Sequence, residues 1–149
     1  MNIQEFTKPA TLEKYSFLWS EARLLIGALA LFMGGVPPIY LIATPAIFGL
    51  VSSLLTLSWI ISGAVALYLL SRWVKGGMKL FGKKDLKDMA AFIVMNVTGL
   101  NLGITGVTGF NIGFSLISGY TILAVTGVVY LITAAYLYQR WMKHGKKFF

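Results

Sequence analysis

The chain has 149 residues, of which 57% are hydrophobic and 12% charged, with no cysteine and a formal net charge of +8. So much apolar surface cannot be buried in one soluble core of this size, so the composition predicts an integral membrane protein. The lack of cysteine excludes disulfides, thiol catalysis and cysteine-based metal sites.

The N-terminal part of the chain predicts an interfacial segment, residues 1–23, that leads into a first membrane span over about residues 24–43. Glycines and prolines at 34–38 interrupt this span. The residues between Arg23 and the interruption are too few, at about 1.5 Å each, to cross a hydrocarbon core of about 30 Å. Two alternatives follow. Either the run continues past the prolines with a break, or the helix begins before Arg23, whose side chain then extends to the membrane surface.

Three further spans are predicted, over about residues 46–70, 89–108 and 112–138. Small residues indicate where helices approach one another closely. In the third span, glycines occupy one helical face, while threonines and an asparagine occupy nearly the opposite face. The residues expected at helix contacts are Ser58, Ser62, Gly99, Gly103, Gly106 and Gly119.

Two segments of the chain are similar: residues 68–81 and 136–149 match at eight of fourteen positions with an offset of 68. Convergence is one interpretation, because aromatic and basic residues commonly follow an apolar run at the membrane surface. The shared Arg-Trp-x-Lys core, with glycine at the same distance beyond it, favours an internal duplication. We therefore expect an all-α fold of four transmembrane helices in two tandem hairpins, residues 24–81 and 82–149, related by a pseudo-two-fold axis along the membrane normal.

Basic residues gather in the 72–87 loop and in the C-terminal tail, whereas the short connections near 40–45 and 109–113 carry no charge. The positive-inside rule therefore places both termini and the loop on the cytoplasmic side of a cytoplasmic or inner membrane. We expect anionic lipid headgroups as partners there. Nucleic-acid binding is not expected, because the chain has no room for a folded basic domain. The expected lipid-contacting side chains are Arg72, Lys75, Arg140 and Lys143.

The sequence offers few groups for chemistry. The predicted spans contain no Asp, Glu, Lys, Arg, His or Cys, so they supply no base, nucleophile or metal ligand within the membrane. The same absence counts against proton-coupled transport. His144, the only histidine, has no second ligand near it in sequence. We therefore expect no catalysis, no metal and no cofactor.

Two functional classes remain. The first is a homo-oligomeric channel or small-solute transport protein, in which polar residues of the third span and the Gly-Pro break of the first line a path. The second is a non-catalytic accessory or scaffolding subunit of a larger membrane complex, in which the same polar residues hydrogen-bond between helices. In both classes we expect a homo-oligomer or a place in a larger complex. The candidate path residues are Asn101, Thr105, Thr98, Thr108, Gly35 and Pro37.

Overall fold

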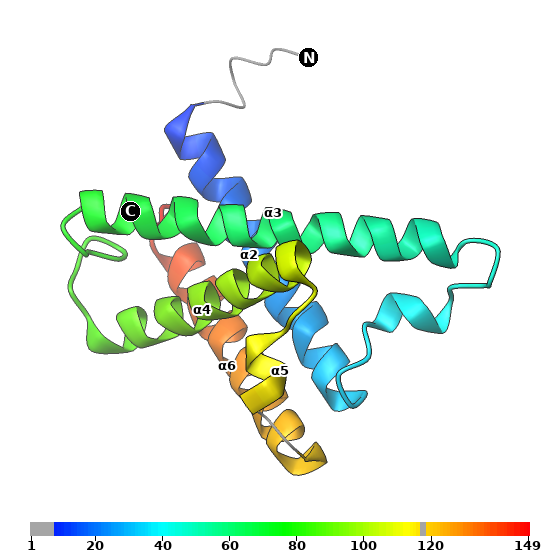
Figure 1. The fold of residues 1–149 in the computed structure, drawn as a ribbon. Helices are drawn as coiled ribbons and strands as arrows, with labels where there is room; N and C mark the ends of the chain where they lie inside the picture. The colour runs from blue at the N-terminus through cyan, green and yellow to red at the C-terminus, as the bar shows by residue number, and fades with distance from the viewer. Residues whose placement is uncertain (1–7, 117–118) are drawn as a thin grey trace.

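The computed structural model describes residues 8–116 and 119–149, and over these residues the chain consists of helices and connecting loops (Figure 1). Four of the helices are long and apolar enough to cross a membrane. This confirms the all-helical fold and the predicted number of spanning helices. The elements are α2 (Pro9–Phe32), η1 (Pro38–Leu41), α3 (Phe48–Lys75), α4 (Leu86–Thr108), α5 (Ile112–Leu116) and α6 (Tyr120–Lys143).

The four long helices form two pairs that cross each other obliquely (Figure 1). Helix α3 packs mainly against α4, and α2 packs mainly against α6. The contacts within each predicted hairpin, α2 with α3 and α4 with α6, are smaller. The main partner of each helix therefore comes from the other predicted hairpin, and all four helices form one interlocked bundle.

The first long helix, α2, is continuous across the boundary expected at residue 23. It begins with Pro9 in its first turn, where the missing N–H costs no hydrogen bond. Its 24 residues reach about 36 Å. It is followed by Gly34 and Gly35, whose φ angles of 75° and 91° lie in the left-handed region that favours glycine. Of the two alternatives above, the structure shows the helix that begins before Arg23.

The side chain of Arg23 does not extend to the membrane surface as that alternative required. It is buried, with 9% of its surface exposed, and Glu21 on the same helix is buried as well. The expectation that the spans lack ionisable residues is therefore wrong for α2. The charges in the first half of this helix were assigned to an interfacial segment because its apolar run begins only at Leu24.

Ion pairs join α2 to α3 and α4 to α6 at one end of the bundle, where α2 and α4 begin and α3 and α6 end; we call it the closed end. Arg72 of α3 donates from Nε to the carboxylate of Glu13 in α2 over 2.6 Å. Arg140 of α6 donates from Nε and Nη2 to the carboxylate of Asp88 in α4 over 2.8 and 2.5 Å. Tyr136 adds a hydrogen bond of 2.7 Å to Asp88, which is fully buried. One arginine–carboxylate pair thus joins α2 to α3, and another joins α4 to α6.

Aromatic side chains fill the closed end. The ring of Phe148, in the segment after α6, lies 4.8 Å from that of Phe17 and 5.7 Å from that of Phe92, between centroids. Phe81, in the loop after α3, lies 5.1 Å from Phe148 and donates its backbone N–H to the Phe148 carbonyl over 3.0 Å. Trp141 is buried against Phe17. The hydrophobic core of the protein is therefore concentrated at this end.

The opposite end of the bundle, which we call the open end, has no ion pair among the described residues. The first turns of α3 and α6 diverge there (Figure 1). Tyr120, at the start of α6, donates to the carbonyl of Phe32 at the end of α2 over 3.1 Å. The hydroxyls of Tyr40 and Ser52 lie 3.4 Å apart and connect η1 to α3.

Candidate functional site

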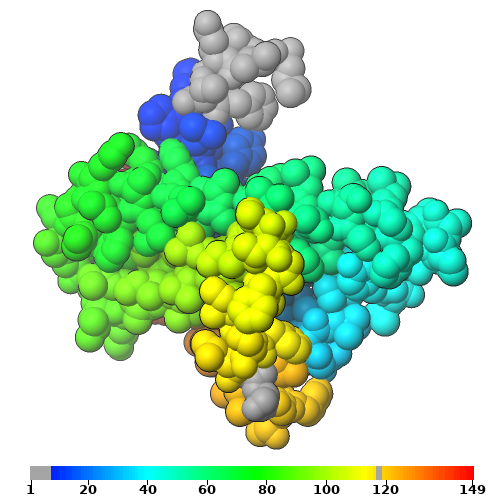
Figure 2. All heavy atoms as spheres, viewed as in Figure 1, coloured from blue at the N-terminus to red at the C-terminus, as the bar shows by residue number. Residues whose placement is uncertain are grey.

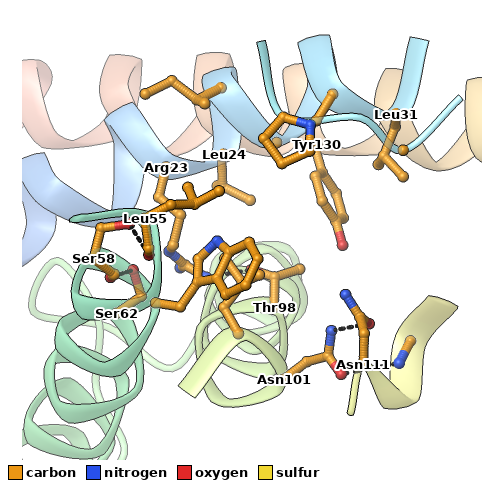
Figure 3. Close-up of a pocket in the computed structure, with 18 of the residues that line it drawn as sticks. Arg23, Leu24, Leu31, Leu55, Ser58, Ser62, Thr98, Asn101, Asn111 and Tyr130 are labelled. Carbon is orange, nitrogen blue, oxygen red and sulfur yellow. Dashed lines mark hydrogen bonds between the residues drawn. The ribbon is translucent and has the colours of Figure 1, made fainter. Parts of the chain in front are cut away.

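A cavity of about 260 Å³ lies between the long helices and reaches the loops of the open end. The surface is hollowed between α5 and the segment that contains η1, with atoms of α2 at the base of the hollow (Figure 2). Every long helix contributes polar side chains to the cavity wall (Figure 3). These side chains are Arg23 from α2, Ser58 and Ser62 from α3, Thr98 and Asn101 from α4, and Tyr130 from α6.

Arg23 is the charged group of the cavity. Its Nη1 donates to the Thr98 hydroxyl over 2.8 Å, and its Nη2 donates to the Met95 carbonyl over 2.6 Å. Its Nε is buried and has no hydrogen-bond partner among the described residues. Gly99 leaves room for the guanidinium, because a Cβ at this position would lie 2.9 Å from Nη1. Helix α4 thus provides two hydrogen-bond acceptors for the guanidinium, the Thr98 hydroxyl and the Met95 carbonyl, and Gly99 leaves the space that the guanidinium occupies.

No salt bridge in the described part of the chain neutralises Arg23, since both ion pairs found there lie at the closed end. The nearest acidic residue in sequence is Glu21. Its carboxyl interacts electrostatically with the Arg23 guanidinium, but the two side chains form no salt bridge. The Glu21 Oε1 is itself buried, with no hydrogen-bond partner within the described ranges.

Trp19 and two serines connect α2 to α3 beside Arg23. The Trp19 indole donates from Nε1 to the Ser62 hydroxyl over 3.0 Å, and Ser62 donates to the Ser58 carbonyl over 2.8 Å. Ser58 in turn donates to the Leu55 carbonyl over 2.7 Å. Ser58 and Ser62, which the sequence predicted as helix-packing residues, both line the cavity.

Asn101 holds the connection between α4 and α5 against the cavity. Its side-chain Nδ2 donates to Oδ1 of Asn111 over 2.8 Å, and its Oδ1 accepts from the backbone N–H of Gly113 over 2.9 Å. Asn111 Oδ1 also accepts from the backbone N–H of Phe114 over 2.9 Å. Asn101 is therefore part of the wall and a brace for the loop beside it.

The rest of the wall is apolar. Gly35 and Pro37, after α2, line its open-end side. A Cβ on Gly35 would lie 2.1 Å from the ring of Phe114, so the segment after α2 and helix α5 touch at this glycine. Further apolar residues that line the cavity are Leu24, Leu31, Leu55 and Trp59.

The structure brings four of the six predicted path residues to the cavity and leaves two outside it. Thr105 is buried, but its hydroxyl donates to the Asn101 carbonyl over 2.8 Å and it does not line the cavity. Thr108 is exposed and donates to the Ile104 carbonyl. Both threonines continue the face of α4 that carries Asn101, but beyond the reach of the cavity. The four that line it are Thr98, Asn101, Gly35 and Pro37.

The glycines of α4 lie along α3. A Cβ on Gly103 would lie 2.6 Å from the Cα of Gly63, and a Cβ on Gly106 would lie 2.9 Å from the backbone nitrogen of Ile60. These backbones approach more closely than side chains would allow. These glycines therefore pack α4 against α3 of the same chain.

Two other glycines from the predicted set have different surroundings. A Cβ on Gly99 would lie 2.9 Å from the Cβ of Ala66, so this glycine accommodates α3 as well as Arg23. Gly119 precedes α6 with a φ of 96°, and a Cβ there would meet nothing within 4 Å among the described residues. The requirement at Gly119 is therefore conformational, in place of the packing contact expected from the sequence.

The basic residues expected to touch lipid fall into two kinds. Arg72 and Arg140 form the ion pairs of the closed end. Lys75 and Lys143 are exposed in the last turns of α3 and α6. Contact with anionic headgroups stays a prediction for all four.

Sequence reasoning missed several residues of the cavity. Trp19 and Arg23 fall within the predicted interfacial segment 1–23, and the sequence did not indicate Tyr130 or Asn111 as site residues. The length of the first helix could have indicated Arg23. A membrane-spanning helix that starts at Pro9 and ends before Gly34 places Arg23 near the middle of the span.

Comparisons with protein-family models, with curated proteins and with solved structures give no match to this chain. Among the described residues, no group of three or more His, Cys, Asp or Glu could hold a metal ion. What the site can bind therefore follows from its own side chains.

Proposed function

We propose that the protein is a small-solute transport protein whose path runs through the central cavity. The observation that supports this is the convergence of Arg23, Thr98 and Asn101 on one cavity, within helices of membrane-spanning length. Ionisable residues at such depth are costly and commonly mark a solute pathway. The cavity reaches the open end, and the aromatic cluster fills the closed end. Such an arrangement suits a central site that is reached from one side at a time.

The proposal includes an internal duplication, supported by paired contacts. Trp73 packs on Phe92 across the α3–α4 contact with ring centroids 5.2 Å apart, and Trp141 packs on Phe17 across the α6–α2 contact at 5.1 Å. The tryptophans differ by 68 positions and the phenylalanines by 75. The arginines and carboxylates of the closed-end ion pairs show the same two offsets.

These two offsets suggest that α3 corresponds to α6, and α2 to α4, with seven more residues between the first helices than between the second. Exchanging the halves would then exchange the α3–α4 contact with the α6–α2 contact. A pseudo-two-fold axis along the membrane normal is consistent with this exchange. Parallel repeats of that kind, with a site between them, occur in secondary transporters.

For the orientation, we propose that the closed end faces the cytoplasm, together with both termini and the 76–85 loop. The loop after α3 and the C-terminal segment share this end and, with the helix turns that adjoin them, carry eight of the ten lysines, whereas the loops of the open end carry no charge. The positive-inside rule then assigns the sides. The cavity would open away from the cytoplasm.

The alternative is an accessory subunit without a path. In this alternative the glycine stripe of α4, formed by Gly99, Gly103 and Gly106, would dock a partner helix. In the structure, Gly103 and Gly106 already face α3 of the same chain, so the stripe is less available to a partner.

Assembly into a homo-oligomer stays a prediction. Proton-coupled transport is compatible with the fold, because the spanning helix α2 contains the ionisable residues Glu21 and Arg23.

The proposal is tested with purified protein in liposomes, by osmotic swelling in a panel of small neutral and anionic solutes. At least one solute should enter faster than into protein-free liposomes. Leu31→Trp should slow this entry, because the indole would fill the cavity that Leu31 lines. Leu29→Trp is the matched control, since Leu29 is 54% exposed on the same helix and lies outside the cavity. Equal swelling with and without protein, for every solute, would support the subunit alternative.

A further inference from the structure

We infer that the cavity recognises the carboxylate of a small organic monoanion, with Arg23 as the cation that binds it. This inference rests on the proposed function and names the class of solute for the same site.

The first step concerns the charge of Arg23. This side chain is 91% buried, and no carboxylate forms a salt bridge with it in the part of the chain that the structure describes. Burying a charge without a salt bridge is strongly unfavourable, and a counter-ion that also accepts hydrogen bonds offsets part of that cost. An anion that enters the cavity would therefore gain more from Arg23 than a neutral solute of the same shape.

The second step concerns the hydrogen bonds that the guanidinium has left to give. Helix α4 accepts one bond at Thr98 and one at the Met95 carbonyl, while Nε is buried without a partner among the described residues. A carboxylate accepts two parallel N–H bonds from a guanidinium, which is the geometry that arginine offers and lysine does not. Nη1 and Nη2 each carry a second N–H besides the one donated to α4, and this pair of donors matches a carboxylate better than a spherical ion.

The third step concerns the rest of the ligand. Beyond Arg23, the cavity is lined largely by apolar side chains, including Leu31, Leu55 and Trp59. A strongly hydrated ion would lose water against these walls without compensation, whereas an apolar body gains from contact with them. The volume of about 260 Å³ lies below the usual range for drug-sized ligands, of about 300 to 1,000 Å³. The fitting class is a carboxylate with a body of a few carbons or a single ring.

The test uses the full-length protein in lipid nanodiscs, with benzoate as the anion and benzamide as its neutral isostere. Trp19 and Trp59 line the cavity, so tryptophan fluorescence reports binding, and calorimetry gives the affinities. Benzoate should bind about tenfold or more tightly than benzamide, since a hydrogen bond to a charged group is stronger than one to a neutral group. Arg23→Gln should remove this preference, and Arg23→Lys should keep part of it. Lys75→Gln removes an exposed cation outside the cavity and should change nothing.

The wild-type comparison decides the question even if Arg23→Gln does not fold, because the two probes differ mainly in charge. Equal affinity for benzoate and benzamide would overturn the inference, as would a preference that survives in Arg23→Gln. Chloride that binds as tightly as benzoate would also overturn it. Benzoate binding without any flux would support this site and contradict the transport function. Flux of neutral solutes without benzoate binding would overturn the inference and leave the transport function standing.

Discussion

Gly63 of α3 and Gly103 of α4 face each other where these helices cross, and a Cβ added to either would lie 2.6 Å from the Cα of the other. No rotamer change can relieve a contact with backbone. The separation of the two helices is therefore set by these two glycines. Helix α4 carries Thr98 and Asn101, and α3 carries Ser58 and Ser62. The crossing therefore fixes the distance between the α3 wall and the α4 wall of the cavity.

Replacing Gly103 with leucine should push α3 and α4 apart and destabilise the protein. Overpacking a well-fitted contact costs about 1 to 3 kcal/mol, and we expect the upper part of that range because the neighbour is backbone. Gly49→Leu is the control on α3, where an added Cβ would meet nothing within 4 Å among the described residues. Thermal unfolding in detergent should show a lower midpoint for Gly103→Leu only. Equal midpoints for the two variants would show that the crossing is not a tight contact.

The two closed-end ion pairs should contribute unequally to stability. Arg140→Ala leaves the fully buried Asp88 with Tyr136 alone, which should cost about 3 kcal/mol. Arg72→Ala should cost at most about 1 kcal/mol, because the Arg72 side chain is 38% exposed and its pair with Glu13 is partly solvated. Denaturant or thermal unfolding of both variants measures the difference. Raising the salt concentration should weaken the Arg72 pair more than the Arg140 pair. A larger loss for Arg72→Ala would contradict the burial that separates them.

The number of spanning helices was predictable because lipid imposes long apolar runs, and only helices satisfy their own backbone within them. The start of α2 was not predictable in the same way. Glu13, Glu21 and Arg23 interrupt its apolar pattern, and the partners of Glu13 and Arg23 lie far along the chain at Arg72 and Thr98. Local hydropathy along the sequence shows the cost of placing such charges in a membrane, but it does not show the distant hydrogen-bond partners that offset this cost.

The candidate site could be predicted in part for a related reason. Thr98 and Asn101 were found because polar residues stand out in an apolar helix, and both line the cavity. Thr105 has the same pattern, yet it lies outside the cavity and bonds to the backbone of its own helix. Which polar residues of one helical face reach a cavity depends on where the neighbouring helices cross. That position is a property of tertiary packing and cannot be read from spacing alone.

The orientation of the protein can be measured directly, because the chain has no native cysteine. Single cysteines in place of Lys84 and Lys143 should both react with a membrane-impermeant maleimide from the cytoplasmic side. Cysteines in place of Thr44 and Phe110, at exposed positions of the open end, should react from the opposite side. Labelling of all four sites from one side would contradict both the four-span topology and the proposed direction of the cavity.

Gly35 and Phe114 should be energetically coupled through the contact that borders the cavity. Gly35→Ala introduces two separate problems: a φ of 91° that alanine rarely adopts, and a Cβ 2.1 Å from the Phe114 ring. The backbone strain amounts to about 1 to 2 kcal/mol and persists whatever stands at position 114. The steric clash disappears when Phe114 is also replaced by alanine. A double-mutant cycle of unfolding free energies should therefore give a coupling of about 1 kcal/mol, with the double variant more stable than the sum of the single changes implies. If the two effects simply add, the Phe114 ring moves aside without cost and the contact does not define this border of the cavity.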